Sequence, residues 1–301
     1  MRITLIHNPR AGRQHRGEGE ALVGMLEHAG HRVRYQSAKE KGLRRALQKR
    51  SDLVVVAGGD GTVGKVARRL ASLGGAVPVA LLPAGTANNI ARSLGLTERP
   101  FEQLIRGFEQ ARRVKLDVGI AAGPWGKRHF VEGVGAGLFA GLLANPQSAK
   151  LKERASPVES SLQRLRDEAA RAEPIELAAR LDGKEISGRY VMFEALNLKY
   201  VGPNLHLAPA STPGDGMLEV VLATEDERAR LVRYLEHWQE NPERLAVLPT
   251  LRGRRLELEW TGFALHIDDK IRPKPKAKPK ELAGIVEVRM DGAAVEFLVP
   301  A

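Results

Sequence analysis

The sequence predicts an α/β domain followed by a β-rich domain, and three observations carry this prediction. First, 301 residues are enough for two domains of ordinary size. Second, short apolar runs alternate with segments of helical periodicity up to about residue 115, as in a parallel sheet flanked by helices. Third, shorter strands of alternating polarity follow Asp117, which is typical of antiparallel sheets. We therefore place an α/β domain at 1–116 and a β-rich domain at 117–301, and leave open whether the last residues pack back on the first domain.

The elements of the first domain follow one another with short connections. Strands are expected at 3–6, 33–37, 53–57 and 77–82, and helices at 18–29, 43–49 and 63–70. Gly30 stands where the first of these helices would end. The third strand is a continuous, mostly β-branched apolar run, as expected of a strand buried between two helical layers.

The second domain is predicted to consist mainly of strands. They are expected at 128–134, 175–181, 190–196, 217–222, 255–260 and 286–299, with amphipathic helices at 160–172 and 226–238. Asp182-Gly183 and Asp291-Gly292 have the composition of hairpin turns. In the segment 272–280 five basic residues alternate with prolines, which predicts an exposed basic loop.

Composition narrows the classes of function. The chain has 47 Lys and Arg against 36 Asp and Glu, a formal charge of +11, which favours contact with polyanions such as lipid head groups or nucleotide phosphates. With no cysteine, disulfides and thiolate chemistry are excluded, and the eight histidines lack the spacing of a zinc site. Only 5% of the residues are aromatic, so we expect no nucleic-acid partner. No apolar run is long enough to cross a bilayer, and we expect a cytoplasmic protein.

Two glycine-rich loops are the strongest chemical signal. Gly58-Gly59-Asp60-Gly61-Thr62 and the segment 83–89 each follow a buried strand and precede a helix, so both should open at the carboxyl edge of one sheet. Glycines let the backbone approach phosphate closely, and the helix start attracts an anion. Asp60 would repel phosphate, which suggests that it holds Mg²⁺ directly or through water. Either loop alone is more often only a turn, but two in register favour a nucleotide site.

An ordered set of motifs resembles the soluble lipid kinases that include bacterial diacylglycerol kinase, sphingosine kinase and ceramide kinase. These motifs are His7-Asn8-Pro9 with Gly12, 58–62, 83–89, Asp117-Val118-Gly119, 130–137, Asn197 with Val201-Gly202-Pro203, and Ala208-Pro209 followed by Asp215-Gly216. The resemblance covers nearly the whole chain. It implies a nucleotide-binding domain with a parallel sheet, similar to NAD kinase and phosphofructokinase, and a C-terminal antiparallel β-sandwich domain that shapes the lipid site, with the active site in a cleft between them.

The resemblance also implies roles for individual residues. The implied ATP contacts are Asn8, Gly12, Ser37, Gly58, Gly59, Asp60, Gly61, Thr62, Gly64, Gly85, Thr86 and Asn88. In bacterial members an Asp and nearby backbone carbonyls hold a structural Mg²⁺, and the matching residues are Thr212, Asp215 and Met217. Without the resemblance, Asp215-Gly216 would be interpreted as a turn.

Three positions depart from the family pattern. Gly64-Lys65 replaces Asn-Glu, and Asn89 stands where many members have Asp. Asp268-Asp269-Lys270 replaces the Asp-Gly-Glu motif whose Glu is the general base, and a charged lysine cannot accept a proton. Either Asp268 or Asp269 serves as the base, or the chain binds nucleotide without phosphorylating a lipid. Lys65 and Lys270 could assist by neutralising the transferring phosphate.

The sequence therefore predicts an ATP- and Mg²⁺-dependent phosphotransferase that acts on a lipid hydroxyl, with diacylglycerol as the first candidate. The predicted catalytic residues are Asp60, Asp268, Asp269 and Lys270. The predicted partner is a lipid at an anionic membrane surface, reached by peripheral association through the basic loop. A non-catalytic nucleotide or lipid sensor and a kinase of a soluble substrate such as NAD stay open as alternatives. The sequence identifies neither the lipid nor the oligomeric state.

Overall fold

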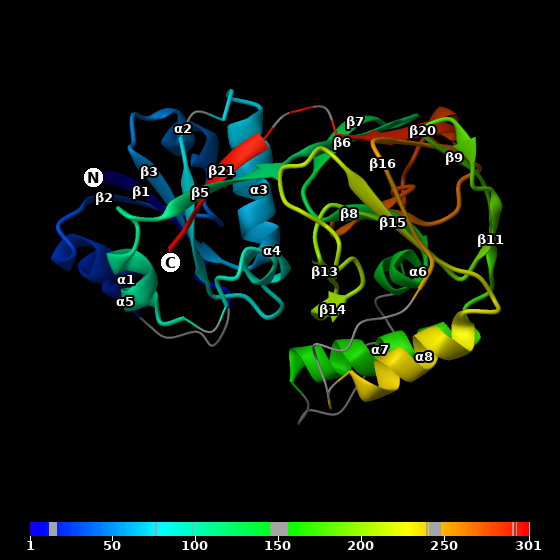
Figure 1. Cartoon of the computed structure of the whole chain (residues 1–301). Helices are drawn as coiled ribbons and strands as arrows, with labels where there is room; N and C mark the ends of the chain where they lie inside the picture. Colours follow the sequence, from blue (N-terminus) through cyan, green and yellow to red (C-terminus); the bar gives the residue numbers. More distant parts are fainter. Residues whose placement is uncertain are drawn as a thin grey trace. The chain divides into compact units, whose positions relative to one another are not determined.

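The computed structural model divides the chain into two compact units (Figure 1). It describes residues 1–11, 17–75, 77–97, 99–144, 156–238, 240, 248–290, 292 and 294–300. The first unit comprises Met1–Val118 with Ala293–Ala301, and the second comprises Gly119–Gly292. Among the described helices, none is long and apolar enough to span a membrane.

The first unit is built on a six-stranded sheet in the order β2-β1-β3-β4-β21-β5. The strands are β1 (Arg2–His7), β2 (Arg32–Ser37), β3 (Leu53–Gly58), β4 (Val79–Pro83), β5 (Arg112–Asp117) and β21 (Ala294–Val299). All pairs are parallel except β21 with β5, which is antiparallel. The predicted parallel sheet is confirmed, and the last strand of the chain lies within it.

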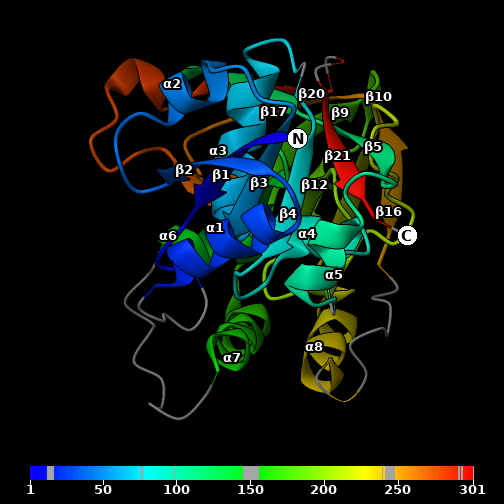
Figure 2. The same cartoon turned by 90° about the vertical axis from the view of Figure 1, so that its left-hand side faces the viewer.

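The described residues of this unit contain the α-helices α1 to α5 (Figure 2). They are α1 (Glu18–His28), α2 (Leu43–Gln48), α3 (Asp60–Ala71), α4 (Asn89–Ser93) and α5 (Phe101–Arg106). In α3, Val63, Val66 and Leu70 recur at helical spacing and are buried, and the helix packs on β3, whose residues are all buried. Helix α3 therefore begins at Asp60, within the first glycine-rich segment, so that only Gly59 separates it from β3.

The second unit contains two antiparallel sheets packed face to face. The first has the order β10-β9-β17-β20-β6-β7, with β11 also on β9, and the second has the order β16-β15-β12-β8-β18-β19. Their strands are β6 (Gly119–Gly123), β7 (Gly126–Phe130), β8 (Gly133–Gly137), β9 (Ile175–Leu181), β10 (Lys184–Glu185), β11 (Gly188–Tyr190), β12 (Met192–Leu196), β15 (Leu218–Ala223), β16 (Thr250–Gly253), β17 (Arg255–Trp260), β18 (Leu265–Ile267), β19 (Lys270–Arg272) and β20 (Gly284–Arg289). A core drawn from both sheets, including Phe130, Phe193 and Trp260, confirms the predicted sandwich.

Helices cover the outer face of the second sheet. A second core joins β12 and β15 to α6 (Leu138–Ala144), α7 (Pro157–Arg171) and α8 (Arg228–His237), and a small hairpin, β13 (Tyr200–Val201) with β14 (Leu205–His206), lies beside it. The helices α7 and α8 cap each other. Arg166 donates to the carbonyls of Leu235 and Glu236, and Arg228 donates to those of Ala169 and Ala172. Both predicted helices are confirmed to within three residues at each end.

Three predicted strands are each two strands in the structure, and those predictions were wrong in this respect. Residues 128–134 divide into β7 and β8, 190–196 divide between β11 and β12, and 286–299 divide into β20 and β21. In each case the two parts belong to different sheets, so the chain must turn where the apolar pattern continues. Asp291 of the other predicted turn, Asp291-Gly292, lies outside the described residues, whereas Asp182-Gly183 joins the paired strands β9 and β10 as predicted.

The basic segment is exposed as predicted, except at its first residue. Lys274, Lys276, Lys278 and Lys280 are all exposed, and a short 3-10 helix, η2 (Pro279–Glu281), begins at the last proline of the segment. Arg272, however, ends strand β19 and is buried, with its guanidinium 5.9 Å from the ring centre of Trp125. The exposed basic loop therefore begins after Arg272.

Candidate active site

The two glycine-rich loops of the first unit touch each other through their glycines. A Cβ on Gly85 would lie 2.3 Å from the Cα of Gly59, and a Cβ on Gly59 would lie 2.9 Å from the Cα of Gly85. The amide of Ala84 also donates to the carbonyl of Gly58 over 3.2 Å. Because β3 and β4 are parallel neighbours, both loops leave the same edge of the sheet. The predicted pair of loops is therefore one continuous backbone surface in which neither glycine can carry a side chain.

Asp60 ties the second loop to the first. Its Oδ1 accepts the amide of Ile90 over 2.9 Å, and the amides of Asn88 and Asn89 also donate to its carboxylate. Burial raises the pKa of Asp60, and these backbone donors oppose that rise. Asp60, which the sequence predicts to hold Mg²⁺ directly or through water, binds the amides at the start of α4 in the structure.

Asn88 closes the second loop on itself. Its Oδ1 accepts the amide of Gly85 over 2.9 Å, and its Nδ2 donates to the carbonyl of the same residue over 2.8 Å. Asn88 has a φ of 55°, in the left-handed region that asparagine tolerates better than most residues. The side-chain amide of Asn88 thus shapes the loop, while Thr86 in the same loop is exposed.

The start of α3 carries the features of an anion-binding site. This helix has 12 residues, enough for its dipole and its first-turn amides to favour a negative charge. A Cβ on the exposed Gly61 would meet no atom within 4 Å, so this part of the surface is open. The side chain of Thr62 lies 3.1 Å from the position of a Cβ on Gly58, and Gly64 is buried beneath Arg68. These residues fit the phosphates of a nucleotide.

Other predicted nucleotide residues lie at the same ends of the neighbouring strands. Asn8 follows β1, and Ser37 is the last residue of β2. Lys65 on α3 donates through Nζ to the carbonyl of Ala38 over 3.0 Å, which joins the helix to the segment after Ser37. Gly12 lies outside the described residues.

In the second unit, Asp268 organises a turn of the backbone. Its Oδ1 accepts the amides of Val131 at 3.0 Å, Glu132 at 2.8 Å and Gly133 at 3.4 Å, and its own amide donates to the carbonyl of Gly133 over 2.9 Å. These bonds satisfy the amides between β7 and β8, which explains why the predicted strand 128–134 is interrupted. The carboxylate of Asp268 thus stabilises the backbone of this turn.

Asp269 and Lys270 form an exposed ion pair next to this turn. The Nζ of Lys270 lies 2.7 Å from Oδ2 of Asp269, with 67% and 53% of the two side chains exposed. Of the two predicted bases, Asp269 is exposed, whereas Asp268 is half-buried and bonded to backbone amides. Lys270 lies beside it, where it can neutralise negative charge.

The residues around Asp215 do not fit a structural magnesium ion. Oδ1 of Asp215 accepts the amide of Met217 over 2.9 Å, and Oδ2 lies 2.5 Å from Nη2 of Arg252. Arg252 also reaches Oε1 of Glu219 at 3.2 Å. A divalent cation at Asp215 would have to displace this guanidinium or lie against its positive charge. Among the residues that the structure describes, no group of three His, Asp or Glu could hold a metal ion.

Arg252 and a buried pair formed by Glu194 and His266 are not among the residues predicted from the sequence. Nε2 of His266 lies 2.7 Å from Oε2 of Glu194, and both side chains are at least 95% buried. A signal for this pair was present, because Glu194 is the one charged residue in the apolar run 191–198, and glycines alternate in the strand 133–137 that runs beside it. Arg252 had no such signal, since its position depends on the pairing of β15 with β16.

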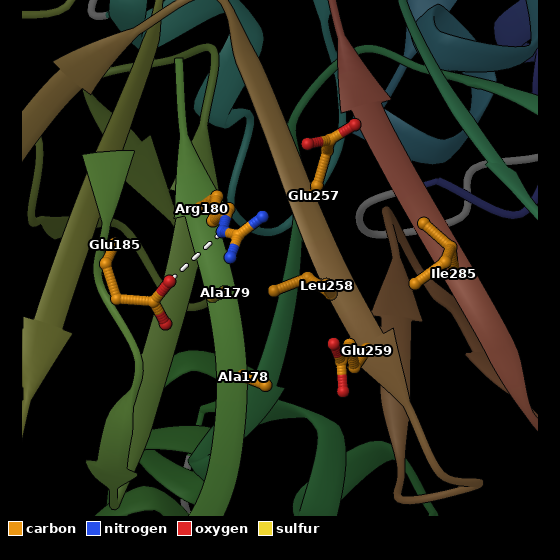
Figure 3. Close-up of a pocket in the computed structure, with 8 residues that line it drawn as sticks. All are labelled: Ala178, Ala179, Arg180, Glu185, Glu257, Leu258, Glu259 and Ile285. Carbon is orange, nitrogen blue, oxygen red and sulfur yellow. Dashed lines mark hydrogen bonds and ion pairs between the residues drawn. The ribbon is translucent and has the colours of Figure 1, made fainter. Parts of the chain in front are cut away.

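A separate shallow pocket lies on the first sheet of the second unit (Figure 3). Its lining residues come from β9, β10, β17 and β20: Ala178, Ala179, Arg180, Glu185, Glu257, Leu258, Glu259 and Ile285. Arg180 is paired with Glu185 across its rim. None of the predicted site residues lines this pocket, and its three glutamates make it unsuited to a phosphate.

Comparison with known proteins identifies both parts of the chain. The family model for the diacylglycerol kinase catalytic domain matches residues 2–121. The model for the YegS C-terminal NAD kinase beta sandwich-like domain matches residues 140–272. The two matches follow one another along the chain and together cover most of it.

Individual relatives agree with these matches. The chain is 27% identical over 243 residues to a diacylglycerol kinase of Bacillus subtilis (strain 168), covering 77% of each chain. It is 26% identical over 281 residues to a diacylglycerol kinase of Mycobacterium tuberculosis, covering 89% of this chain and 88% of the relative. A crystal structure of a diacylglycerol kinase from Bacillus anthracis str. Sterne has the same fold, with a TM-score of 0.73 and 20% identity over 99% of this chain and 96% of that one.

Proposed function

Since this chain belongs to the diacylglycerol kinase family of phosphotransferases, we propose that it transfers the γ-phosphoryl group of Mg·ATP to the hydroxyl of a lipid, with diacylglycerol as the first candidate. The observation that carries the proposal is the contact between Gly59 and Gly85, which makes one backbone surface of two loops at the start of α3. Such a surface suits phosphate, because amides and a helix dipole bind the anion without a side chain between them.

The phosphates of Mg·ATP would lie on this surface of the first unit. The amides at the start of α3 and the hydroxyl of Thr62 would bind them, and the missing side chain of Gly61 leaves room for close approach. Asn8 and Ser37 would contact the rest of the nucleotide. Asp60 would act by holding the second loop in place, since its carboxylate is engaged with the amides of that loop. Magnesium would enter with ATP as part of the substrate.

Asp269 would accept the proton of the lipid hydroxyl. In the reaction the hydroxyl oxygen bonds to the γ-phosphorus, the bond from that phosphorus to the bridging oxygen of ADP breaks, and the proton passes to the carboxylate. Phosphoryl transfer depends more on positioning and charge neutralisation than on a strong base, so an exposed aspartate is sufficient. Lys270, 2.7 Å from Asp269, would neutralise charge that builds up on the transferring group.

The exposed lysines would bring the protein to an anionic membrane surface. Lys274, Lys276, Lys278 and Lys280 all point into solvent within seven residues, and each basic residue near such a surface contributes about 1 kcal/mol. Replacing all four with Gln should weaken binding to phosphatidylglycerol vesicles, most strongly at low salt. Vesicle binding equal to that of the unchanged protein would exclude this loop as the anchor.

The decisive experiment is radiolabelled phosphate transfer from Mg·ATP to micelles of diacylglycerol, monoacylglycerol, sphingosine, ceramide or phosphatidylglycerol, with NAD as a soluble acceptor. The control is Gly61→Asp, which adds a negative charge at a position where a side chain meets no other atom. This variant should weaken binding of the ATP phosphates without disturbing the fold. Gly61→Ala serves as its neutral match. Labelled diacylglycerol that is absent with Gly61→Asp would support the proposal.

Two outcomes would replace the proposed lipid kinase function with another. Label in NAD and in no lipid would make the protein a kinase of a soluble substrate. Binding of ATP without transfer to any acceptor would favour a nucleotide or lipid sensor, the alternative suggested by Lys270 in place of the family's glutamate. In that case Lys270→Glu would be the first variant to test for restored activity.

A further inference from the structure

Glu194 and His266 form a buried acid–base pair in the middle of the second sheet of the second unit. Glu194 on β12 and His266 on β18 both lie opposite Gly135 of the intervening strand β8. A Cβ on Gly135 would fall 2.1 Å from Oε2 of Glu194, so only glycine leaves space for the two side chains to meet across this strand. Their neighbours Phe193, Ala195, Leu265 and Ile267 point into the sandwich core, so the pair lies on the opposite face.

The hydrogen bonds of His266 determine where its protons are. Nδ1 lies 3.0 Å from the carbonyl oxygen of Asp268, which can only accept, so Nδ1 carries a proton. Nε2 lies 2.7 Å from Oε2 of Glu194, and one proton must lie between these two atoms. Burial raises the pKa of Glu194; burial alone would lower that of His266, but contact with the Glu194 carboxylate raises it. The pair therefore keeps its shared proton.

His266 connects this pair to the turn that carries the proposed base. It holds the carbonyl of Asp268, whose amide and carboxylate are bound to the segment 131–133. Asp268 is thereby fixed on three sides in a conformation with a φ of 48°, which non-glycine residues seldom adopt. The side chain of Asp269 leaves the chain at the next residue, so its direction depends on this conformation.

A buried pair of this kind lowers the free energy of unfolding compared with well-packed apolar residues. Removing two ionisable groups from water costs several kcal/mol, and apolar residues of similar size would often stabilise a protein as well or better. Oε1 of Glu194 is buried with no hydrogen-bond partner among the described residues, which adds to the cost. The sheet does not require the Glu194–His266 pair for its stability. A role in holding the Asp268–Asp269 turn would explain why the pair is present.

We propose that Glu194 and His266 are positioning residues that hold the Asp268–Asp269 turn in the conformation in which Asp269 reaches the lipid hydroxyl. This proposal rests on the proposed function, in which Asp269 accepts the proton. It makes neither Glu194 nor His266 a catalytic residue, because both are buried behind the turn.

Two substitutions of His266 separate its two hydrogen bonds. The amide of His266→Asn can occupy the place of Nδ1 and keep the donor to Asp268, whereas that of His266→Gln reaches towards Glu194 and loses this donor. We expect His266→Gln to lower kcat by about tenfold or more with little change in the KM for ATP, and His266→Asn to retain most of the activity. Glu194→Gln, which keeps the shape of the pair but removes its charge, should lie between them.

Amide hydrogen exchange tests the same proposal without any kinase assay. Peptides that cover 129–135 and 266–270 should exchange faster in His266→Gln than in His266→Asn, because these amides bond within the turn. Peptides from β9 and β17 should be unchanged in both variants, which verifies that the sandwich is folded. Equal exchange of the turn in both variants and the unchanged protein would overturn the proposal.

The two measurements distinguish failure of this inference from failure of the proposed function. If Asp269→Asn retains full kinase activity, Asp269 is not the base and the link from the pair to lipid phosphorylation is lost. If Asp269→Asn is inactive but His266→Gln changes neither kcat nor exchange, the base is correct and the positioning role is wrong.

Discussion

Asp60 in the first unit and Asp268 in the second occupy the acidic positions of two predicted catalytic motifs, yet both bind backbone amides. Asp60 accepts amides at the start of α4, and Asp268 accepts those of 131–133. Each carboxylate replaces water at amides that the fold would otherwise leave unpaired. In both units the aspartate of the predicted catalytic motif, Asp60 or Asp268, stabilises the backbone around the candidate site.

The two regions differ in the groups that lie beside these aspartates and are available to a substrate. Beside Asp60 the two loops meet through Gly59 and Gly85, whose backbones approach too closely for a side chain to lie between them. Beside Asp268 there is an exposed carboxylate, Asp269, paired with a lysine. The first region is thus suited to bind an anion and the second to receive a proton. A motif acid therefore marks the place of a site more reliably than it identifies the reacting group.

The largest expected effect on ATP binding comes from filling the contact between the two glycine-rich loops. Gly85→Ala puts a Cβ 2.3 Å from the Cα of Gly59, so the loops must separate, which should cost about 1–3 kcal/mol of unfolding free energy and most of the ATP affinity. Urea denaturation and calorimetric ATP titration would measure both. Gly61→Ala, where the added methyl group meets no atom, should leave stability nearly unchanged; equal losses in the two variants would refute the contact as the cause.

The next effect separates Asp268 from its neighbour. Asp268→Ala leaves three amides without their acceptor and should lower the unfolding free energy by about 3 kcal/mol. Asp269→Ala removes an exposed ion pair and should change it by less than about 0.5 kcal/mol while abolishing lipid phosphorylation. The comparison fails if Asp269→Ala destabilises the protein as much as Asp268→Ala does.

Asp60 should make the unfolding free energy of the protein depend on pH. Its pKa is raised from 3.8 by burial, so the folded state binds its proton more tightly than the unfolded chain does. The unfolding free energy contributed by Asp60 therefore falls as pH rises from about 4 through the raised pKa. Asp60→Asn, which keeps one acceptor for the amide of Ile90, should lose this contribution. Parallel pH dependences for the two proteins, measured by urea denaturation from pH 4 to 7, would show that the pKa of Asp60 is not raised.

The smallest expected effect concerns magnesium at Asp215. Because Arg252 already supplies a positive charge to Asp215 and Glu219, Mg²⁺ without nucleotide should shift the melting temperature of the protein by less than about 1 °C. Arg252→Met should be less stable and should gain a response to Mg²⁺. A clear stabilisation of the unchanged protein by Mg²⁺ that disappears in Asp215→Asn would instead establish the metal site implied by the resemblance.

The sequence by itself determined most helices and strands of the first unit and the edge of the sheet at which the two glycine-rich loops converge. Strand and helix periods, with glycines at 58–59 and 85, were sufficient for this, because parallel strands that alternate with helices have only a few right-handed arrangements. The resemblance to the lipid kinases also pointed to Asp268-Asp269-Lys270 as the place of the general base. It could not distinguish Asp268 from Asp269, since the two differ only in which distant amides they meet.

Tertiary structure alone decided the sheet to which each strand belongs and the partner of each buried charge. The alternation of apolar residues changes phase between Val288 and Val295, but only the pairing with β4 and β5 shows that β21 belongs to the first unit. Likewise Arg252 meets Asp215, and Glu194 meets His266, across strands that are far apart in the chain. Local patterns record burial and periodicity, whereas contacts between distant residues depend on the register of the assembled sheets.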